Sequence, residues 1–585
     1  MPYTSANTTT MQKHIEKNHS DLQKAAKTES NLVRMKGQTT IANAFAAKLP
    51  TSSARATAIT RDIGVFIAAD MRPFSVVENL GFRRLIRTLE PKYAIPSRTH
   101  FTRTVVPTLY NECKVNVVQT LKDAETIALT TDGWTSRCTQ SYITITAHTI
   151  NSKWEMVNFV LQTRPHYESH TGANIAEVLQ AAVTDWNLRK PNHTIAIVTD
   201  NARNMDVAVR EAGFEPHIKC FAHTINLATQ AGLGVARVAR LLGRVRRVTA
   251  FFHRSSTAAA SLTSKQKLLE LPQHKLIMDV TTRWNSTLDM LVRYLEQQAA
   301  IAAALTGPEV RQHARNIDTL DTCDIVNAED LVKLLNPLKT ATTVLCEEKT
   351  PTVSLIVPLK NMIEQSMAPN DSDSPTVTDV KRAILTNISG RYSGDVYNYL
   401  LESTALDPRF QTLPQLDHDQ REAVFQSIKK RIEQLLQNQP TDETSAHCST
   451  HWRDGALGAE GGAEGGPESE ETEPATKKTA LEDLLGDAFS KTEQSSKGIE
   501  REIELYRREP SISLSCCPLK WWRENSSKYP LLSPLVKAYF SIPATSVPSE
   551  RVSSTAGDIV TAQRSQLLPE NVDMLIFLKK NMSLS

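Results

Sequence analysis

Two apolar segments that each lead into an aspartate constrain the fold of this chain most strongly. Residues 127–131 run into Asp132 and Gly133, and residues 194–199 repeat the pattern before Asp200. Such β-branched, apolar runs predict buried strands, and a glycine lets the backbone turn after the first one. If the strands are parallel neighbours, both aspartates lie at one edge of a sheet, where they are suited to a divalent cation. Capping of a following turn or helix is the alternative role of each aspartate.

The segments around these aspartates predict an α/β core over residues 127–230. Sequential strands are predicted over 127–131, 141–150 and 154–163. Their short connections favour an antiparallel arrangement. A helix, the strand before Asp200, a second helix, a strand near Ile218 and a further helix follow. The order β-β-β-α-β-α-β-α is that of a ribonuclease-H-like fold, in which the first and fourth strands are neighbours.

The chain has 585 residues, which exceeds the length that one hydrophobic core serves. Composition and periodicity predict a polar N-terminus (1–60), a small helical unit (61–126), the α/β core (127–230), a helical segment (231–440), an acidic Gly- and Glu-rich linker (441–499) and a last helical region (500–585). The linker is too poor in apolar residues to form a core. No apolar run is long enough to span a bilayer, so no membrane partner is expected.

Charge and cysteine content narrow the function classes. The net charge is +3, so any basic surface for nucleic acid must be local. The eight cysteines are scattered without a Cys-x-x-Cys pair. This excludes a disulfide framework and a four-cysteine zinc site, and it favours an intracellular protein.

Two further groups carry half of a metal-site pattern. His14 and His19 have the spacing of the second half of a zinc finger, but the ten residues before Met11 contain no cysteine. Because a structural zinc needs four ligands, Zn²⁺ is expected only if a cysteine pair lies upstream, and a polar tail is the alternative. Cys220 and His223 form a Cys-x-x-His pair without a second pair nearby. The alternative is that Cys220 packs in the core while His223 opens a helix.

A basic stretch follows in the helical segment. Its arginines are Arg237, Arg240, Arg244, Arg246, Arg247 and Arg254. The default interpretation is an amphipathic helix with a solvated basic face, and the alternative is contact with the DNA backbone. Arg283 and Trp284 come later, and a lone tryptophan is most often a core residue.

Together these stretches resemble the hAT superfamily of DNA transposases, and within it the BED-zinc-finger group. The motifs that carry the resemblance are TDGWT (131–135), VTDNA (198–202), CFAHT (220–224), RWNS (283–286), LDPRF (406–410) and PATSVPSER (543–551). The resemblance implies an α/β plus α protein: a ribonuclease-H-like mixed sheet interrupted by a long all-helical insertion, with a C-terminal helical dimerisation region. The last motif begins that region, which continues through RSQLLPE (564–570).

The resemblance also implies a chemistry. Asp132, Asp200 and Glu550 are the three carboxylates that hold Mg²⁺ in a catalytic member, where two ions assist transfer of a DNA strand. Trp284 is expected to stack on a flipped base, together with DNA contacts from the neighbouring Arg283 and from Arg244, Arg246 and Arg247. Cys220 and His223 are expected to shape the floor of the site rather than to bind zinc.

This chain departs from the family pattern in two places. Ser553 stands where a phenylalanine usually follows the SERV motif. The absence of this phenylalanine is expected to remove an apolar anchor from the helix that carries Glu550. The front half of the BED finger is missing ahead of His14 and His19, so the finger is expected to be truncated.

Three functions are compatible with these features. The first is a nuclear DNA-binding regulator that forms homodimers. The second is an active transposase that uses two Mg²⁺. The third is a finger-less partner that dimerises with full-length relatives through residues 500–585. DNA is the expected partner in the first two cases, and none of the three uses a small-molecule substrate.

Overall fold

The computed structural model describes residues 48–136, 139–190, 194–437, 497–559 and 567–582. His14 and His19 lie outside the described residues, as does nearly all of the predicted acidic linker. The chain divides into two compact units, residues 1–113 and residues 114–585.

The described part of the first unit is helical. Its elements are α4 (Ala54–Ala69), η1 (Phe74–Glu78), α5 (Leu80–Leu89), α6 (Arg98–His100), η2 (Phe101–Val105) and the start of α7 (Val106–Asp123). Ser53 caps α4 by accepting a hydrogen bond from the Ala56 amide, which satisfies one of the free donors of the first turn. Gly64 allows close packing in this unit, because a Cβ atom there would lie 2.6 Å from Cγ1 of Val105.

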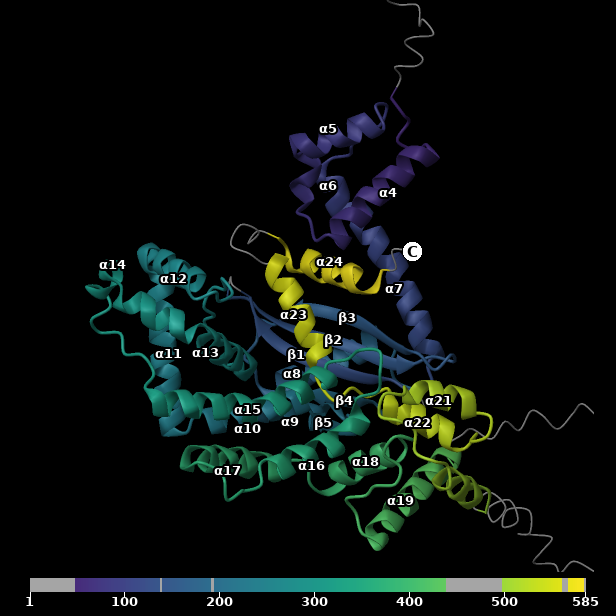
Figure 1. Cartoon of the computed structure of the whole chain (residues 1–585). Coiled ribbons are helices and arrows are strands. Elements are labelled where there is room, and N and C mark those ends of the chain that lie inside the picture. The colour runs from purple at the N-terminus through teal and green to yellow at the C-terminus, as the bar shows by residue number, and fades with distance from the viewer. Residues whose placement is uncertain (1–47, 137–138, 191–193, 438–496, 560–566, 583–585) are drawn as a thin grey trace, which may run out of the picture. The chain divides into compact units, whose positions relative to one another are not determined.

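A mixed sheet forms the centre of the second unit. Its strands are β1 (Ala128–Thr135), β2 (Ser141–Ile150), β3 (Met156–Pro165), β4 (Ala196–Thr199) and β5 (His217–Lys219). The spatial order is β3-β2-β1-β4-β5 (Figure 1). β1, β2 and β3 are antiparallel neighbours, whereas β4 is parallel to β1 and to β5. The predicted meander and the predicted pairing of the first and fourth strands are therefore confirmed.

β1 is longer than the sequence predicts. It continues through Asp132 and Gly133 to Thr135, because residues 128–135 all pair with β2. Trp134 stacks on Tyr142 with ring centroids 4.7 Å apart, and this cross-strand pair stabilises the extension. The prediction of a turn at Gly133 is wrong, and Asp132 lies within the strand.

Helices pack on the sheet, and a long helical segment follows it in the chain. α8 (Gly172–Asp185), α9 (Arg203–Ala212) and α10 (Phe221–Leu233) alternate with the later strands. The helical segment contains α11 (Ala236–Arg254), α12 (Ser256–Leu268), α13 (Trp284–Thr306), α14 (Pro308–Arg311), α15 (Thr322–Leu345), η3 (Val353–Leu355), α16 (Ile356–Ser366), α17 (Pro375–Ser389), α18 (Gly394–Ala405) and α19 (His418–Gln437). One cluster of buried side chains runs from the sheet into these helices. The expected α/β plus α class is confirmed.

The C-terminal region is packed onto the sheet. After a helical stretch over 497–507 come α21 (Pro518–Asn525), α22 (Leu532–Phe540), α23 (Val547–Ile559) and α24 (Pro569–Asn581). α23 crosses β1 and β2, and α24 lies along β3 (Figure 1, yellow). Trp522 of α21 stacks on Trp154 from the turn between β2 and β3, with ring centroids 6.1 Å apart. The last helices thus complete the core that the first strands begin.

α24 closes the outer edge of β3 with side chains. The amide of Asn581 donates to the Val160 carbonyl at 2.7 Å and accepts from the Val160 N–H at 3.0 Å. Oδ1 of Asp573 accepts the N–H of Thr163 at 2.6 Å. These groups would otherwise be unpaired donors and acceptors of an edge strand. No helix in the described ranges combines the length and the apolar character that crossing a bilayer requires.

Candidate acid site at the carboxyl edge of the sheet

Three elements carry the predicted carboxylates to one edge of the sheet. The parallel register pairs Thr130 of β1 with Val198 of β4. Asp132 and Asp200 each lie two residues beyond this last registered pair, so both follow the point where the parallel pairing of β1 and β4 ends. Glu550 lies in the first turn of α23, the helix that crosses β1 and β2.

The electrostatics of Asp132 reflect this convergence. Its pKa is raised to about 7, first by burial and next by the charge of Glu550, with Asp200 acting in the same direction. The hydrogen bond from Ser553 and the positive charge of Arg283 act against the rise. Burial and neighbouring carboxylates both disfavour the charged form. Asp132 therefore interacts with both of the other predicted acids.

Each carboxylate uses one oxygen in a hydrogen bond within the chain. The hydroxyl of Ser553 donates to Oδ2 of Asp132 at 3.0 Å, and that of Ser546 donates to Oε1 of Glu550 at 3.2 Å. Oδ1 of Asp200 accepts the N–H of Ala202 at 3.0 Å, so the alternative role of this aspartate, the capping of a turn, also exists in the structure. Among the described residues, no hydrogen bond reaches the second oxygen of these carboxylates.

Ser546 and Ser553 are site residues that the motif analysis does not select. The sequence expectation for Ser553 is a lost anchor, but its hydroxyl instead joins α23 to β1. The local signal is the spacing from Glu550: Ser546 stands four residues before it, just ahead of α23, and Ser553 stands three residues after it on the same helix face.

Cys220 and His223 lie at the start of α10, beside the acids. The Cys220 side chain is fully buried, and its sulfur accepts the His223 N–H at 3.4 Å as the cap of the helix. Burial, followed by the charge of Glu550, raises the pKa of the thiol to about 11. A neutral, buried thiol that caps a helix has a structural role, as the alternative interpretation predicts.

The predicted DNA-contacting residues lie in different environments. Arg283 and Arg247 are exposed, and the charge of Arg283 acts on Asp132. Arg246 makes three hydrogen bonds to Asp279, whose side chain is 1% exposed. Arg244 pairs with Asp324. Two of the four arginines are thus already neutralised by acids of the protein.

Trp284 does not occupy the expected position. Its side chain is 1% exposed and belongs to the main core at the start of α13. The turn before it is held to α10, where Asn226 accepts the Trp284 N–H at 3.3 Å and Gln230 donates to the Thr281 carbonyl at 2.8 Å. The expectation that the indole stacks on a flipped base does not apply to this conformation, because its faces are covered by protein.

The donor chemistry of the acid site fits Mg²⁺. This ion prefers carboxylate oxygens, and the three predicted acids supply such oxygens from three different elements. Within the described residues, no group of three or more His, Cys, Asp or Glu side chains is placed to hold one metal ion in this conformation. Of the three charges that act on the pKa of Asp132, that of Glu550 has a larger effect than those of Asp200 and Arg283.

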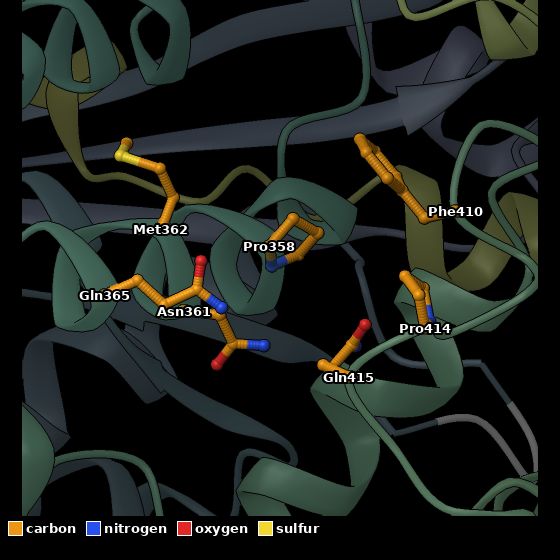
Figure 2. A pocket seen from close by; sticks show the side chains of 7 residues that line it. All are labelled: Pro358, Asn361, Met362, Gln365, Phe410, Pro414 and Gln415. Carbon is orange, nitrogen blue, oxygen red and sulfur yellow. The ribbon is translucent and has the colours of Figure 1, made fainter.

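A separate pocket lies on the helical segment and offers no comparable chemistry. It is lined by Pro358, Asn361, Met362, Gln365, Phe410, Pro414 and Gln415 (Figure 2). These residues come from α16 and from the turn after α18, and none of them carries a charge. The pocket therefore suits neither a metal ion nor a phosphate group.

Comparisons with known proteins agree with the fold. Residues 130–215 match the ZBED1 RNase-like domain, and residues 218–328 match the ZBED1 RNase-like helical domain. Residues 502–582 match the hAT family C-terminal dimerisation region. These three parts of the chain are thus similar to domains of the hAT family and of ZBED1-type proteins. The first match contains β2, β3, β4 and most of β1, the second contains most of β5 and the helical segment up to the start of α15, and the third contains α21 to α24.

Proteins of known name are similar to this chain over most of its length. Zinc finger BED domain-containing protein 4 of Homo sapiens is 27% identical over 548 residues, which are 90% of this chain and 44% of that protein. The protein named "Putative AC transposase" of Zea mays is 25% identical over 541 residues, 87% of this chain and 63% of its own length. Zinc finger BED domain-containing protein 6 of Homo sapiens is 25% identical over 566 residues, 90% of this chain and 55% of its own. The chain thus spans about half the length of these relatives.

Proposed function

We propose that this chain is a nuclear DNA-binding protein that self-associates and acts as a regulator on a transposase fold. The observation that carries the proposal is the similarity of residues 502–582 to the hAT family C-terminal dimerisation region, the region in which α23 crosses β1 and β2 while α24 closes β3. A dimer formed through this region fixes two copies of the same sheet edge relative to each other. Such an arrangement suits a ligand with repeated charge, because each copy presents the exposed Arg283 beside its acids.

Phosphate contact is the second part of this proposal. Arginines that are not paired within the protein are available to neutralise DNA phosphates. Arg283 and Arg247 are exposed, in contrast to Arg244 and Arg246, which are held by acids. Of the four arginines predicted to contact DNA, Arg247 and Arg283 are therefore the two that we assign to it.

The test combines oligomeric state with DNA affinity. The full chain is measured by light scattering and by fluorescence anisotropy on a duplex of random sequence over a range of salt concentrations. The double variant R247A/R283A should bind more weakly, and its salt dependence should fall by about one unit of slope per lost contact. R382A is the matched control, since Arg382 is exposed but paired with Asp379.

Two results would contradict this proposal. A monomer at every concentration would refute self-association, and unchanged DNA affinity in the double variant would refute the assignment of Arg247 and Arg283 to DNA. A chain that binds full-length relatives, but binds DNA weakly and without sequence preference, would instead favour the finger-less partner.

Metal-dependent cutting of DNA is the second candidate, favoured by the convergence of charge on Asp132. In this case Asp132, Asp200 and Glu550 hold Mg²⁺, which supplies charge stabilisation and an activated oxygen nucleophile. The three acids would hold the ion, and Arg283, whose charge acts on Asp132, would add positive charge at the site. D132N and E550Q should each abolish nicking of plasmid DNA in Mg²⁺, and nicking that survives both changes would refute the site.

A further inference from the structure

A serine hydroxyl on the helix that carries Glu550 donates a hydrogen bond to a side chain of β1. Ser553 lies three residues after Glu550, so both side chains project from the same face of α23. Its Oγ is 3.0 Å from Oδ2 of Asp132, a residue 421 positions away in the sequence. The bond therefore links Asp132 to the helix that carries Glu550, the carboxylate whose charge acts most strongly on Asp132.

This contact differs from what a helical serine ordinarily does. Serine within a helix tends to bond the carbonyl of the preceding turn. Here the Oγ of Ser553 is 3.4 Å from the Ser549 carbonyl and closer, at 3.0 Å, to the carboxylate. Because a hydroxyl has one hydrogen to donate, the shorter contact to the charged acceptor is the stronger one.

We propose that Ser553 is a positioning residue, which fixes the Asp132 carboxylate against α23 so that Asp132 and Glu550 present oxygens to one divalent cation. This inference rests on the metal-dependent candidate function. A carboxylate has two oxygens and about four acceptor positions, so one hydroxyl on Oδ2 orients the group and leaves Oδ1 for the ion. A side chain without a hydroxyl at this position cannot make the bond.

The hydrogen bond has a measurable consequence for metal affinity. Outer-shell groups that orient metal-binding carboxylates change affinity by about 10- to 100-fold when they are removed. We therefore expect S553A to raise the dissociation constant for Mn²⁺ by about tenfold or more. S553T keeps the hydroxyl and should bind Mn²⁺ like the wild type.

The experiment measures free Mn²⁺ by electron paramagnetic resonance as the full chain is titrated at pH 8. S553T and S553V form a matched pair, since they have the same shape and differ in the hydroxyl. S554A is the control on the same helix, because Ser554 is exposed. Thermal unfolding of every variant is measured in parallel, so that a loss of folding is recognised separately from a loss of the ion.

Each outcome decides between the claims. Weaker Mn²⁺ binding in S553A and S553V, with wild-type binding in S553T and S554A, supports the inference. If the wild type binds Mn²⁺ and D132N does not, but S553A and S553V bind normally, the inference on Ser553 fails and the metal site stands. If the wild type binds no Mn²⁺, both the metal-dependent function and this inference fail, while the DNA-binding function is unaffected.

Discussion

Replacing Asp573 by asparagine tests how α24 closes the edge of the sheet. Asp573 accepts the N–H of Thr163 on the outer edge of β3 at 2.6 Å. Burial raises the pKa of this carboxyl from 3.8 to about 6, against the opposing effects of the Thr163 hydrogen bond and of Arg164 and Lys114. The asparagine of D573N keeps an oxygen that can accept the same N–H, but it does not titrate.

The expected magnitude follows from the pKa. A shift from 3.8 to about 6 corresponds to at most about 3 kcal/mol at 1.36 kcal/mol per pKa unit, and less to the extent that solvent reaches the carboxyl. Between these two values the folded chain binds more protons than the unfolded chain. The free energy of unfolding therefore falls as the pH rises from about 4 to about 6, and it stays lowered at pH 7.

The assay compares thermal midpoints of the wild type and D573N at intervals from pH 4 to pH 8. The midpoint of D573N minus that of the wild type should rise between pH 4 and pH 6 and then level off. A constant offset from the new amide does not affect this slope. Parallel curves would refute the assignment of a raised pKa to Asp573. D573A is the control that leaves the Thr163 N–H unpaired, so it should be less stable than D573N by about 1–3 kcal/mol at every pH.

Three further predictions concern the acid site and its surroundings. Because the pKa of Asp132 is about 7 and a bound cation competes with the proton, Mn²⁺ affinity should increase between pH 6 and pH 8, and a flat profile would contradict the role of Asp132 as a ligand. R246A removes the ion pair of the buried Asp279 carboxylate, which keeps only the hydrogen bond from Thr287, so it should destabilise the chain by at most about 3–5 kcal/mol in chemical denaturation; a change below about 1 kcal/mol would show that the Thr287 hydrogen bond and solvent suffice for Asp279. W284A should cost about 3–5 kcal/mol through the cavity it leaves, whereas W284F should retain DNA affinity, and a selective loss of DNA binding in W284F would instead support stacking on a base.

Local patterns in the sequence predict the centre of this fold. Apolar and β-branched runs report strands because alternation and burial are properties of neighbouring residues. The runs before Asp132 and Asp200 were enough to predict parallel neighbours and two aspartates at one sheet edge, and the parallel register agrees with this. The motif around Glu550 identifies a third acid by its resemblance to the family. The hydrophobic pattern of the chain does not predict which strands the helix with Glu550 packs against.

Only the tertiary structure decides what each of these residues touches. α23 is 421 positions from its partner in β1 when measured from Ser553 to Asp132, and such a contact depends on how whole elements pack. The same holds for Trp284, which the RWNS motif suggests as a base-stacking residue and which the core covers almost completely. It also holds for Arg246 of α11, which forms an ion pair with Asp279 in the segment between α12 and α13. The sequence determined which residue types were available and which strands they follow, whereas packing over hundreds of residues decided which charges remain free and which oxygens face the acid site.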